Sequence, residues 1–158
     1  MAAPALTLKR VLCATDLSEF GNRAVDIAFA AVAAGGTVTL VHVVHEAAVP
    51  SPLVPHYGER HPSPSELAER QRQASAHLTA LAEPAARGRK VSFEVRTPRA
   101  AEITDALLGE AERIDADLIC LATHSRTGLT KLVLGSAAHD LLVEAHRPVL
   151  LVPSPVEG

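Results

Sequence analysis

Short apolar runs alternate with amphipathic stretches along the whole chain, and this alternation constrains the fold more than any other feature. The first four runs of strand-forming residues each precede a stretch whose apolar residues lie three and four positions apart, as on one face of a helix. The predicted strands are residues 8–15, 38–44, 91–95, 117–122 and 148–152. Strands that alternate with helices favour a parallel sheet, because each helix carries the chain back to the edge where the next strand begins. We therefore expect an α/β fold with an open parallel sheet and helices on both faces.

Capping residues mark where the predicted helices begin. Ser18 can cap the first helix, and Ser63, followed three residues later by Glu66, forms a capping box for the second. The other helix boundaries are predicted at Gly35-Gly36, Gly88, Thr97-Pro98, Gly135 and Ala145. The first helix is expected to bury the stripe Phe20, Ala24, Ile27, Ala28 and Ala31.

The size and charge of the chain limit the number of domains it can form and the kinds of partner it can bind. Its 158 residues and 16.6 kDa fit one domain over residues 1–158, with a core at about 8–153. The formal net charge is −3, and the aromatic residues are three Phe and one Tyr. A chain with neither a basic excess nor an aromatic stacking surface is a poor nucleic-acid binder, so we expect no nucleic-acid partner.

No membrane segment is expected. Residues 27–45 contain no Asp, Glu, Lys or Arg and are about as long as a bilayer span, but Gly35 and Gly36 interrupt them. The N-terminal residues do not resemble a secretory leader. Two cysteines, Cys13 and Cys120, lie inside apolar runs, which suits a reducing compartment. These features predict a cytoplasmic protein.

Residues 46–62 form a proline-rich loop that is long for a connection inside a compact domain. It follows the second predicted strand, so it could form a lid over a binding site or bind a partner. The alternative is a disordered connection without a function of its own.

Two loops are the candidates for a ligand site. In an open parallel sheet, ligands bind beyond the carboxyl ends of the strands, where the strand order reverses. The loops that leave the first and fourth predicted strands are Asp16–Ser18 and Thr123–Leu134. The second loop carries Arg126 and Lys131 and leads into a helix N-terminus, where backbone N–H groups favour an anion. This combination indicates a nucleotide; the alternative is a helix start at which glycine serves packing.

Other chemistries find little support. His42 and His45 are three residues apart in a predicted strand and should face opposite ways, so we expect no metal site there. Cys13 and Cys120 are predicted on neighbouring strands as inert core thiols. The chain contains no Gly-x4-Gly-Lys-[Ser/Thr], Gly-x-Gly-x-x-Gly or Gly-x-Ser-x-Gly sequence.

The sequence resembles the universal stress protein family over about residues 9–153. The resemblance is carried by six segments: Cys13-Ala14-Thr15-Asp16-Leu17-Ser18, His42-Val43, Ala116-Asp117-Leu118-Ile119, Thr123-His124-Ser125-Arg126-Thr127-Gly128-Leu129, Leu134-Gly135-Ser136 and Arg147-Pro148-Val149-Leu150. It implies a Rossmann-like fold of the adenine-nucleotide-hydrolase type, with five parallel strands in the order 3-2-1-4-5.

The resemblance is closer to the ATP-binding branch of that family, with two departures. ATP-binding members carry Gly-x2-Gly-x9-Gly-[Ser/Thr] after the fourth strand. At that spacing this chain has Ala122 and Ser125, and then Gly135-Ser136. Alanine adds one methyl group, and serine at a position that needs positive φ would cost about 1 kcal/mol or somewhat more. Neither change removes the anion site at Gly135-Ser136.

The resemblance also implies roles for individual residues. Asp16 matches the aspartate on the base and ribose side, Val43 a backbone contact to the base, and Gly135-Ser136 the phosphate-binding pair. The nucleotide-binding positions implied in this chain are Ala14, Thr15, Asp16, Val43, Leu121, Ala122, Thr123, His124, Ser125, Arg126, Gly128, Gly135, Ser136 and Ala137.

The function implied is that of a cytoplasmic stress-response protein that binds ATP or another adenine nucleotide, with Mg²⁺ as an additional candidate. It would signal through nucleotide occupancy and through a homodimer with Val149 to Val152 at the contact. One alternative is a dimeric scaffold that binds no nucleotide. Another is a weak ATPase, although no residue set in the sequence supports strong catalysis.

Overall fold

A five-stranded parallel sheet forms the centre of the molecule. The computed structural model describes residues 5–46, 49–50, 59–123 and 136–153. The strands of this sheet are β1 (Arg10–Ala14), β2 (Thr37–Val41), β6 (Ser92–Arg96), β8 (Leu118–Thr123) and β9 (Val149–Pro153). They lie side by side in the order β6-β2-β1-β8-β9, and every pairing between them is parallel. Counted along the chain, this is the predicted order 3-2-1-4-5, and the predicted fold class is confirmed.

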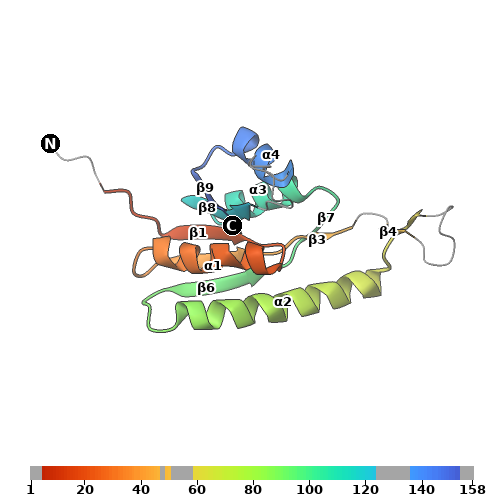
Figure 1. Cartoon of the computed structure of the whole chain (residues 1–158), viewed down its shortest axis with the longest axis horizontal. Coiled ribbons are helices and arrows are strands. Elements are labelled where there is room, and N and C mark those ends of the chain that lie inside the picture. Colours follow the sequence, from red (N-terminus) through yellow and green to blue (C-terminus); the bar gives the residue numbers. More distant parts are fainter. Residues whose placement is uncertain (1–4, 47–48, 51–58, 124–135, 154–158) are drawn as a thin grey trace, which may run out of the picture.

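Helices cover both faces of the sheet (Figure 1). They are α1 (Glu19–Ala31), α2 (Pro64–Ala86), α3 (Ile103–Arg113) and α4 (Ser136–Glu144). One core cluster joins Val11, Cys13 and Leu40 to α1 and α2, and a second joins Leu12 and Val41 to α3 and α4. Alternate residues of β1 thus enter opposite cores, as the two-residue period of a strand requires. A central strand buried on both faces explains the unbroken apolar run at its position in the sequence.

The predicted strand 38–44 is wrong in its second half. β2 ends at Val41, and β3 (Val44–His45) pairs with β7 (Arg99–Ala100) in a separate two-stranded sheet. The backbone N–H of His42 still donates to Arg96 O at 3.1 Å, and that of Val44 donates to Pro98 O at 2.8 Å. The segments that follow β2 and β6 therefore stay paired as they leave the main sheet.

The same pairing delays the third helix. It was predicted from Thr97-Pro98, but α3 begins at Ile103 because β7 occupies two of the preceding residues.

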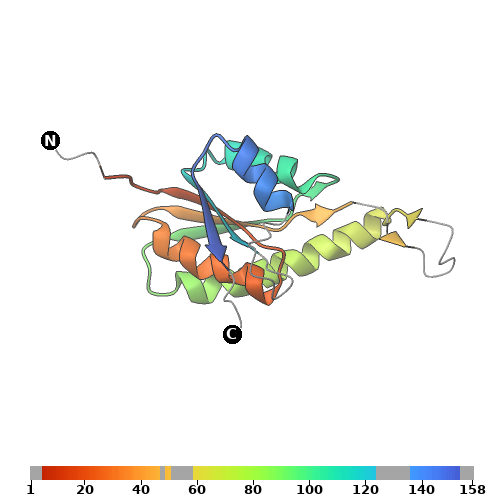
Figure 2. The ribbon, with the colours of Figure 1, turned by 45° about the horizontal axis from the view of Figure 1, so that its top comes forward.

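Within the proline-rich loop, β4 (Val49–Pro50) pairs antiparallel with β5 (Glu59–Arg60), which the sequence did not reveal. Figure 2 shows that the N-terminal half of α2 extends past the main sheet toward this pair.

Both predicted N-caps are confirmed. The Ser18 side chain accepts from Gly21 N, and Ser63 and Glu66 form the complete capping box. Arg60 adds two hydrogen bonds to the Glu66 carboxylate, at 2.7 and 2.8 Å. The hydrogen bonds from Arg60, together with those from Ser63, lower the pKa of Glu66 to about 2.

The buried face of α1 is rotated from the predicted stripe. Ala24 and Ala28 are buried as predicted, together with Val25 and Phe29, but Phe20 and Ile27 are each 41% exposed. The alanine-rich sequence offers apolar residues on more than one side of the helix. Packing against the sheet therefore selects a face that the spacing left open.

Asp117 joins the start of β1 to the start of β8. One carboxylate oxygen accepts from the backbone N–H groups of Lys9 and Arg10, each at 2.8 Å, and the other accepts from the Arg10 side chain at 3.3 Å. Burial alone would raise the pKa of Asp117, but these hydrogen bonds outweigh it and lower that pKa. The contact fixes the register of the two strands at their amino ends.

Glu110 forms the most buried ion pair described. Its side chain is 9% exposed and lies between Arg96, which donates at 3.1 and 3.3 Å, and Arg113, which donates at 2.8 Å. Desolvation would raise the pKa of Glu110, but hydrogen bonds from the two guanidinium groups lower it below its usual range. The cluster ties α3 to the edge strand β6.

Substitution of Glu110 by Gln is expected to lower the free energy of unfolding at neutral pH by about 1–3 kcal/mol, since it removes charge-assisted hydrogen bonds from a buried acceptor. The Glu110 pKa is lower in the folded state, so its stabilising effect is present above its unfolded value of about 4.3 and is lost as pH falls through the folded value. Urea unfolding across pH measures this.

The control is Glu112→Gln, an exposed residue of the same helix, which should change stability little. A difference between wild type and the Glu110→Gln variant that stays constant from neutral pH to about pH 3 would contradict the ion-pair explanation.

Candidate functional site

A cavity of about 220 Å³ lies at the carboxyl ends of β1, β2 and β8. Its lining residues come from these strands, the loops that follow them, α1, α3 and the first turn of α4. They are Ala14, Thr15, Asp16, Gly21, Val41, His42, Val43, Ile103, Leu107, Leu121, Ala122, Ala137 and Ala138. β1 and β8 are the strands between which the chain order reverses, so the cavity occupies the position predicted for a ligand.

A tight turn after β1 presents Asp16 to the cavity. Leu17 has φ of +64°, a left-handed conformation that is strained for a branched residue, and its N–H donates to Thr15 Oγ1 at 3.0 Å. Asp16 Oδ1 accepts from both the N–H and the hydroxyl of Ser18, and Ser18 in turn caps α1. The carboxylate is thus held by the same hydrogen bonds that start the helix.

Gly21 keeps this side of the cavity open. A Cβ atom at this position would lie 2.2 Å from Asp16 Oδ1, 2.9 Å from Thr15 Oγ1 and 3.2 Å from the Asp16 backbone nitrogen. Any side chain at residue 21 would therefore displace the carboxylate. Close approach, rather than an unusual φ, is the reason for glycine here.

The opposite walls are apolar. Val41, Val43, Leu107 and Leu121 are buried, and Ile103 is partly exposed at the rim. His42 donates from Nδ1 to the Thr15 backbone carbonyl at 3.0 Å, because a carbonyl can only accept. A flat apolar ring with polar groups along one edge suits a cavity of this kind.

The structure brings several predicted residues together in this cavity: Ala14, Thr15, Asp16, Val43, Leu121, Ala122 and Ala137. Thr123 is a C-terminal residue of β8 and Ser136 is the first residue of α4. His124, Ser125, Arg126, Gly128, Lys131 and Gly135 lie outside the described residues. The N-terminal end of α4 lies at the cavity, because Ala137 and Ala138 line it.

Six lining residues were not predicted from the sequence: Gly21, Val41, His42, Ile103, Leu107 and Ala138. Gly21 could have been noticed in the sequence, because glycine has a low helix propensity and its place in the first turn of a predicted helix suggests another reason for it. His42 was assigned to a continuous strand that in fact ends at Val41. Ile103 and Leu107 are apolar residues of α3, and nothing in a single sequence distinguishes a cavity wall from a core position.

The two cysteines are confirmed as neighbours. Cys13 pairs with Cys120 across β1 and β8, both are fully buried, and the Cys120 thiol donates to Ala24 O at 3.6 Å. The contact with Cys120 and burial raise the pKa of the Cys13 thiol. Among the residues the structure describes, no group of three His, Cys, Asp or Glu side chains could hold a metal ion.

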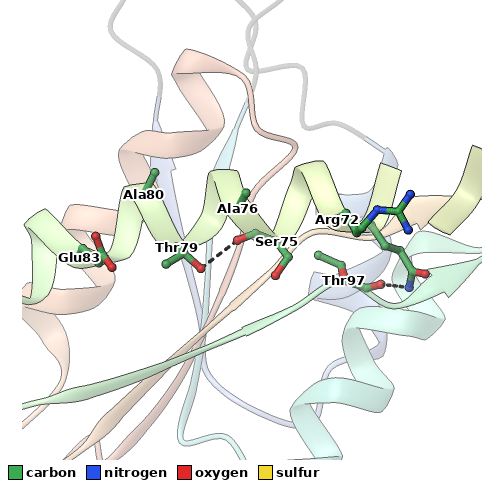
Figure 3. A pocket seen from close by; sticks show the side chains of 8 residues that line it. Arg72, Ser75, Ala76, Thr79, Ala80, Glu83 and Thr97 are labelled. Atoms are coloured by element: carbon green, nitrogen blue, oxygen red, sulfur yellow. Dashed lines mark hydrogen bonds between the residues drawn. The ribbon is translucent and has the colours of Figure 1, made fainter. Parts of the chain in front are cut away.

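A second hollow lies on the outer side of α2 (Figure 3) and contains none of the predicted residues. Its walls are small or polar side chains such as Ser75 and Thr79, with Thr97 across from them. Gln71 donates to the Thr97 carbonyl at 2.6 Å and so fixes the helix against the segment after β6. It is a shallow surface between packed elements.

The described part of the chain contains no helix able to cross a membrane.

Comparisons with known proteins find relatives in sequence and in fold. A universal stress protein from Mycolicibacterium smegmatis is 40% identical over 62 residues, which cover 39% of this chain and 48% of that protein. The chain thus matches about half the length of this curated relative. A solved structure from the universal stress protein family of Burkholderia pseudomallei is 25% identical, with a TM-score of 0.67 over 96% of this chain and 100% of that one.

The universal stress protein from Archaeoglobus fulgidus, solved in complex with dAMP, shares the fold with a TM-score of 0.57 and 19% identity, over 93% of this chain and 98% of that one. The model of the universal stress protein family matches residues 7–153, almost the whole chain. The chain belongs to the universal stress protein family.

Proposed function

We propose that this chain binds an adenine nucleotide, ATP or AMP, in the cavity between β1, β2 and β8. The observation that carries the proposal is the convergence of Asp16, Val43 and the start of α4 on one cavity. The base would lie between the apolar walls, the ribose beside Asp16, and the phosphates toward the N–H groups at the start of α4. The dAMP complex of the Archaeoglobus relative supports an adenine ligand.

The altered glycine motif is compatible with this proposal. Ala122 lines the cavity, so its methyl group forms part of the wall. Its backbone belongs to β8, where the extended conformation suits alanine as well as glycine.

Nucleotide occupancy would then serve as the signal in a stress response. Two free, buried thiols are compatible with the reducing conditions of the cytoplasm.

The proposal is tested by analysing the small molecules that the purified protein releases on denaturation. ATP, ADP and AMP are then titrated into the emptied protein by calorimetry, with and without Mg²⁺. Stoichiometric adenine nucleotide or a saturable titration is expected. An intact fold with no heat at millimolar nucleotide would refute nucleotide binding and favour the scaffold alternative.

Substitution of Gly21 by Ala is expected to weaken nucleotide binding by about tenfold or more, because the new Cβ forces Asp16 away from its position. Calorimetric titration of AMP measures the change. The matched control is Gly109→Ala on α3, where a Cβ would meet no atom within 4 Å. That variant should bind normally and gain up to about 1 kcal/mol of stability. Equal affinities for the two variants would argue against a role for Asp16.

We also propose a homodimer through β9, one of the two edge strands of the main sheet. Unpaired N–H and C=O groups on an edge strand can pair with a second chain. Exposed apolar residues accompany this edge: Leu150 on β9, at 37% exposed, and Leu142 and Val143 on α4, at 44% and 71%. They are the kind of surface that a dimer contact would cover.

Val143→Glu and Leu150→Glu are each expected to shift the protein toward the monomer in sedimentation experiments, because a charge would be buried in the contact. Leu6→Glu is the control, since Leu6 is 77% exposed in the segment before β1. Dimers that persist in both β9-side variants would place the contact elsewhere.

A further inference from the structure

A groove of about 480 Å³ adjoins the proposed nucleotide cavity, between α2 and the β2–β3 connection. We call it the histidine groove, because His42 and His45 line one wall and His77 lines the other, beside Arg70 and Gln73. His42 and His45 reach the same groove because the strand breaks after Val41. The expectation that they face opposite ways is therefore wrong.

The histidine groove continues the nucleotide cavity. His42, Val43 and Ile103 line both spaces. Asp16 lines the cavity, and Leu17, the next residue, lines the groove. A substituent on the ribose beside Asp16 would therefore have a route into the groove.

Two of the imidazoles have one nitrogen fixed by a backbone carbonyl. His42 Nδ1 donates to Thr15 O at 3.0 Å, and His45 Nε2 donates to Ala101 O at 2.6 Å. Each ring therefore has its second nitrogen on the side away from the carbonyl. An imidazolium donates from both nitrogens, so each histidine can hold its carbonyl and an anionic oxygen together.

The charge of the groove favours an anion. Its lining residues include Arg70 and no Asp or Glu, although the whole chain carries a net charge of −3. The carboxylates nearest to Arg70 in sequence have other partners: Glu66 pairs with Arg60, and Glu69 pairs with Arg72. Arg70 thus offers a guanidinium fork, the side chain best suited to phosphate oxygens.

We propose that the histidine groove binds a second phosphoryl group, carried by the ribose of the nucleotide whose base occupies the neighbouring cavity. This inference rests on the proposed function and names its ligand class: adenosine nucleotides phosphorylated at the 5′ position and also at the 2′ or 3′ position. The 5′ phosphate faces the start of α4, and the second phosphoryl group meets Arg70 and the imidazoles.

The test compares AMP with adenosine 2′,5′-bisphosphate and adenosine 3′,5′-bisphosphate by calorimetry on the full chain. At least one bisphosphate is expected to bind about tenfold more tightly than AMP, as charge-assisted hydrogen bonds to a guanidinium require. The better of the two isomers identifies the ribose position. Arg70→Gln should remove this gain and leave AMP affinity unchanged. Arg72→Gln, on the same helix but outside the groove, should preserve it.

Affinities within about twofold for AMP and both bisphosphates would overturn the inference and leave adenine-nucleotide binding intact. A gain that survives Arg70→Gln would overturn it as well. If none of the three binds, the proposed function fails, and inorganic phosphate is titrated while the imidazole signals are followed by NMR. Saturable shifts of His42 and His77 that Arg70→Gln abolishes would support the phosphoryl site without the nucleotide; their absence would overturn it.

Discussion

Parallel pairing of β1 with β2 on one side and β8 on the other is the constraint on which the rest of the structure depends. Val11, Leu12 and Cys13 are fully buried because both faces of this strand are covered. The chain leaves β1 toward one side of the sheet and later returns through β8 on the other, so the loops after these strands diverge. The cavity at their carboxyl ends is the space that this divergence leaves open.

The turn after β1 shows how closely the start of α1 and the candidate site depend on each other. Ser18 caps α1 and also donates to Asp16, so the hydrogen bonds that begin the helix orient the carboxylate. Gly21, in the first turn of the same helix, leaves room for that carboxylate. The left-handed Leu17 is the strained residue that lets the chain pass from strand to helix within so short a span. A change at any of these positions would alter both the helix start and the site.

Much of this could be predicted from the sequence, and the failures have a common cause. Periodicity predicted the strands of the main sheet, and the family resemblance predicted their order. The capping residues predicted the helix starts at Ser18 and Ser63. What was missed depends on tertiary contacts: the buried face of α1, and the bend after Val41 where β3 leaves the main sheet to pair with β7. That bend also brings His42 and His45 into one groove, so a local error in strand length concealed a feature of the site.

The contact of Asp117 with Lys9 and Arg10 lies at the end of β1 opposite the cavity. It ties the two central strands at their amino ends, whereas the loops that follow their carboxyl ends diverge around the cavity. The strand register, and with it the set of residues that β1 and β8 present to the cavity, is therefore fixed at the end of the sheet farthest from the cavity.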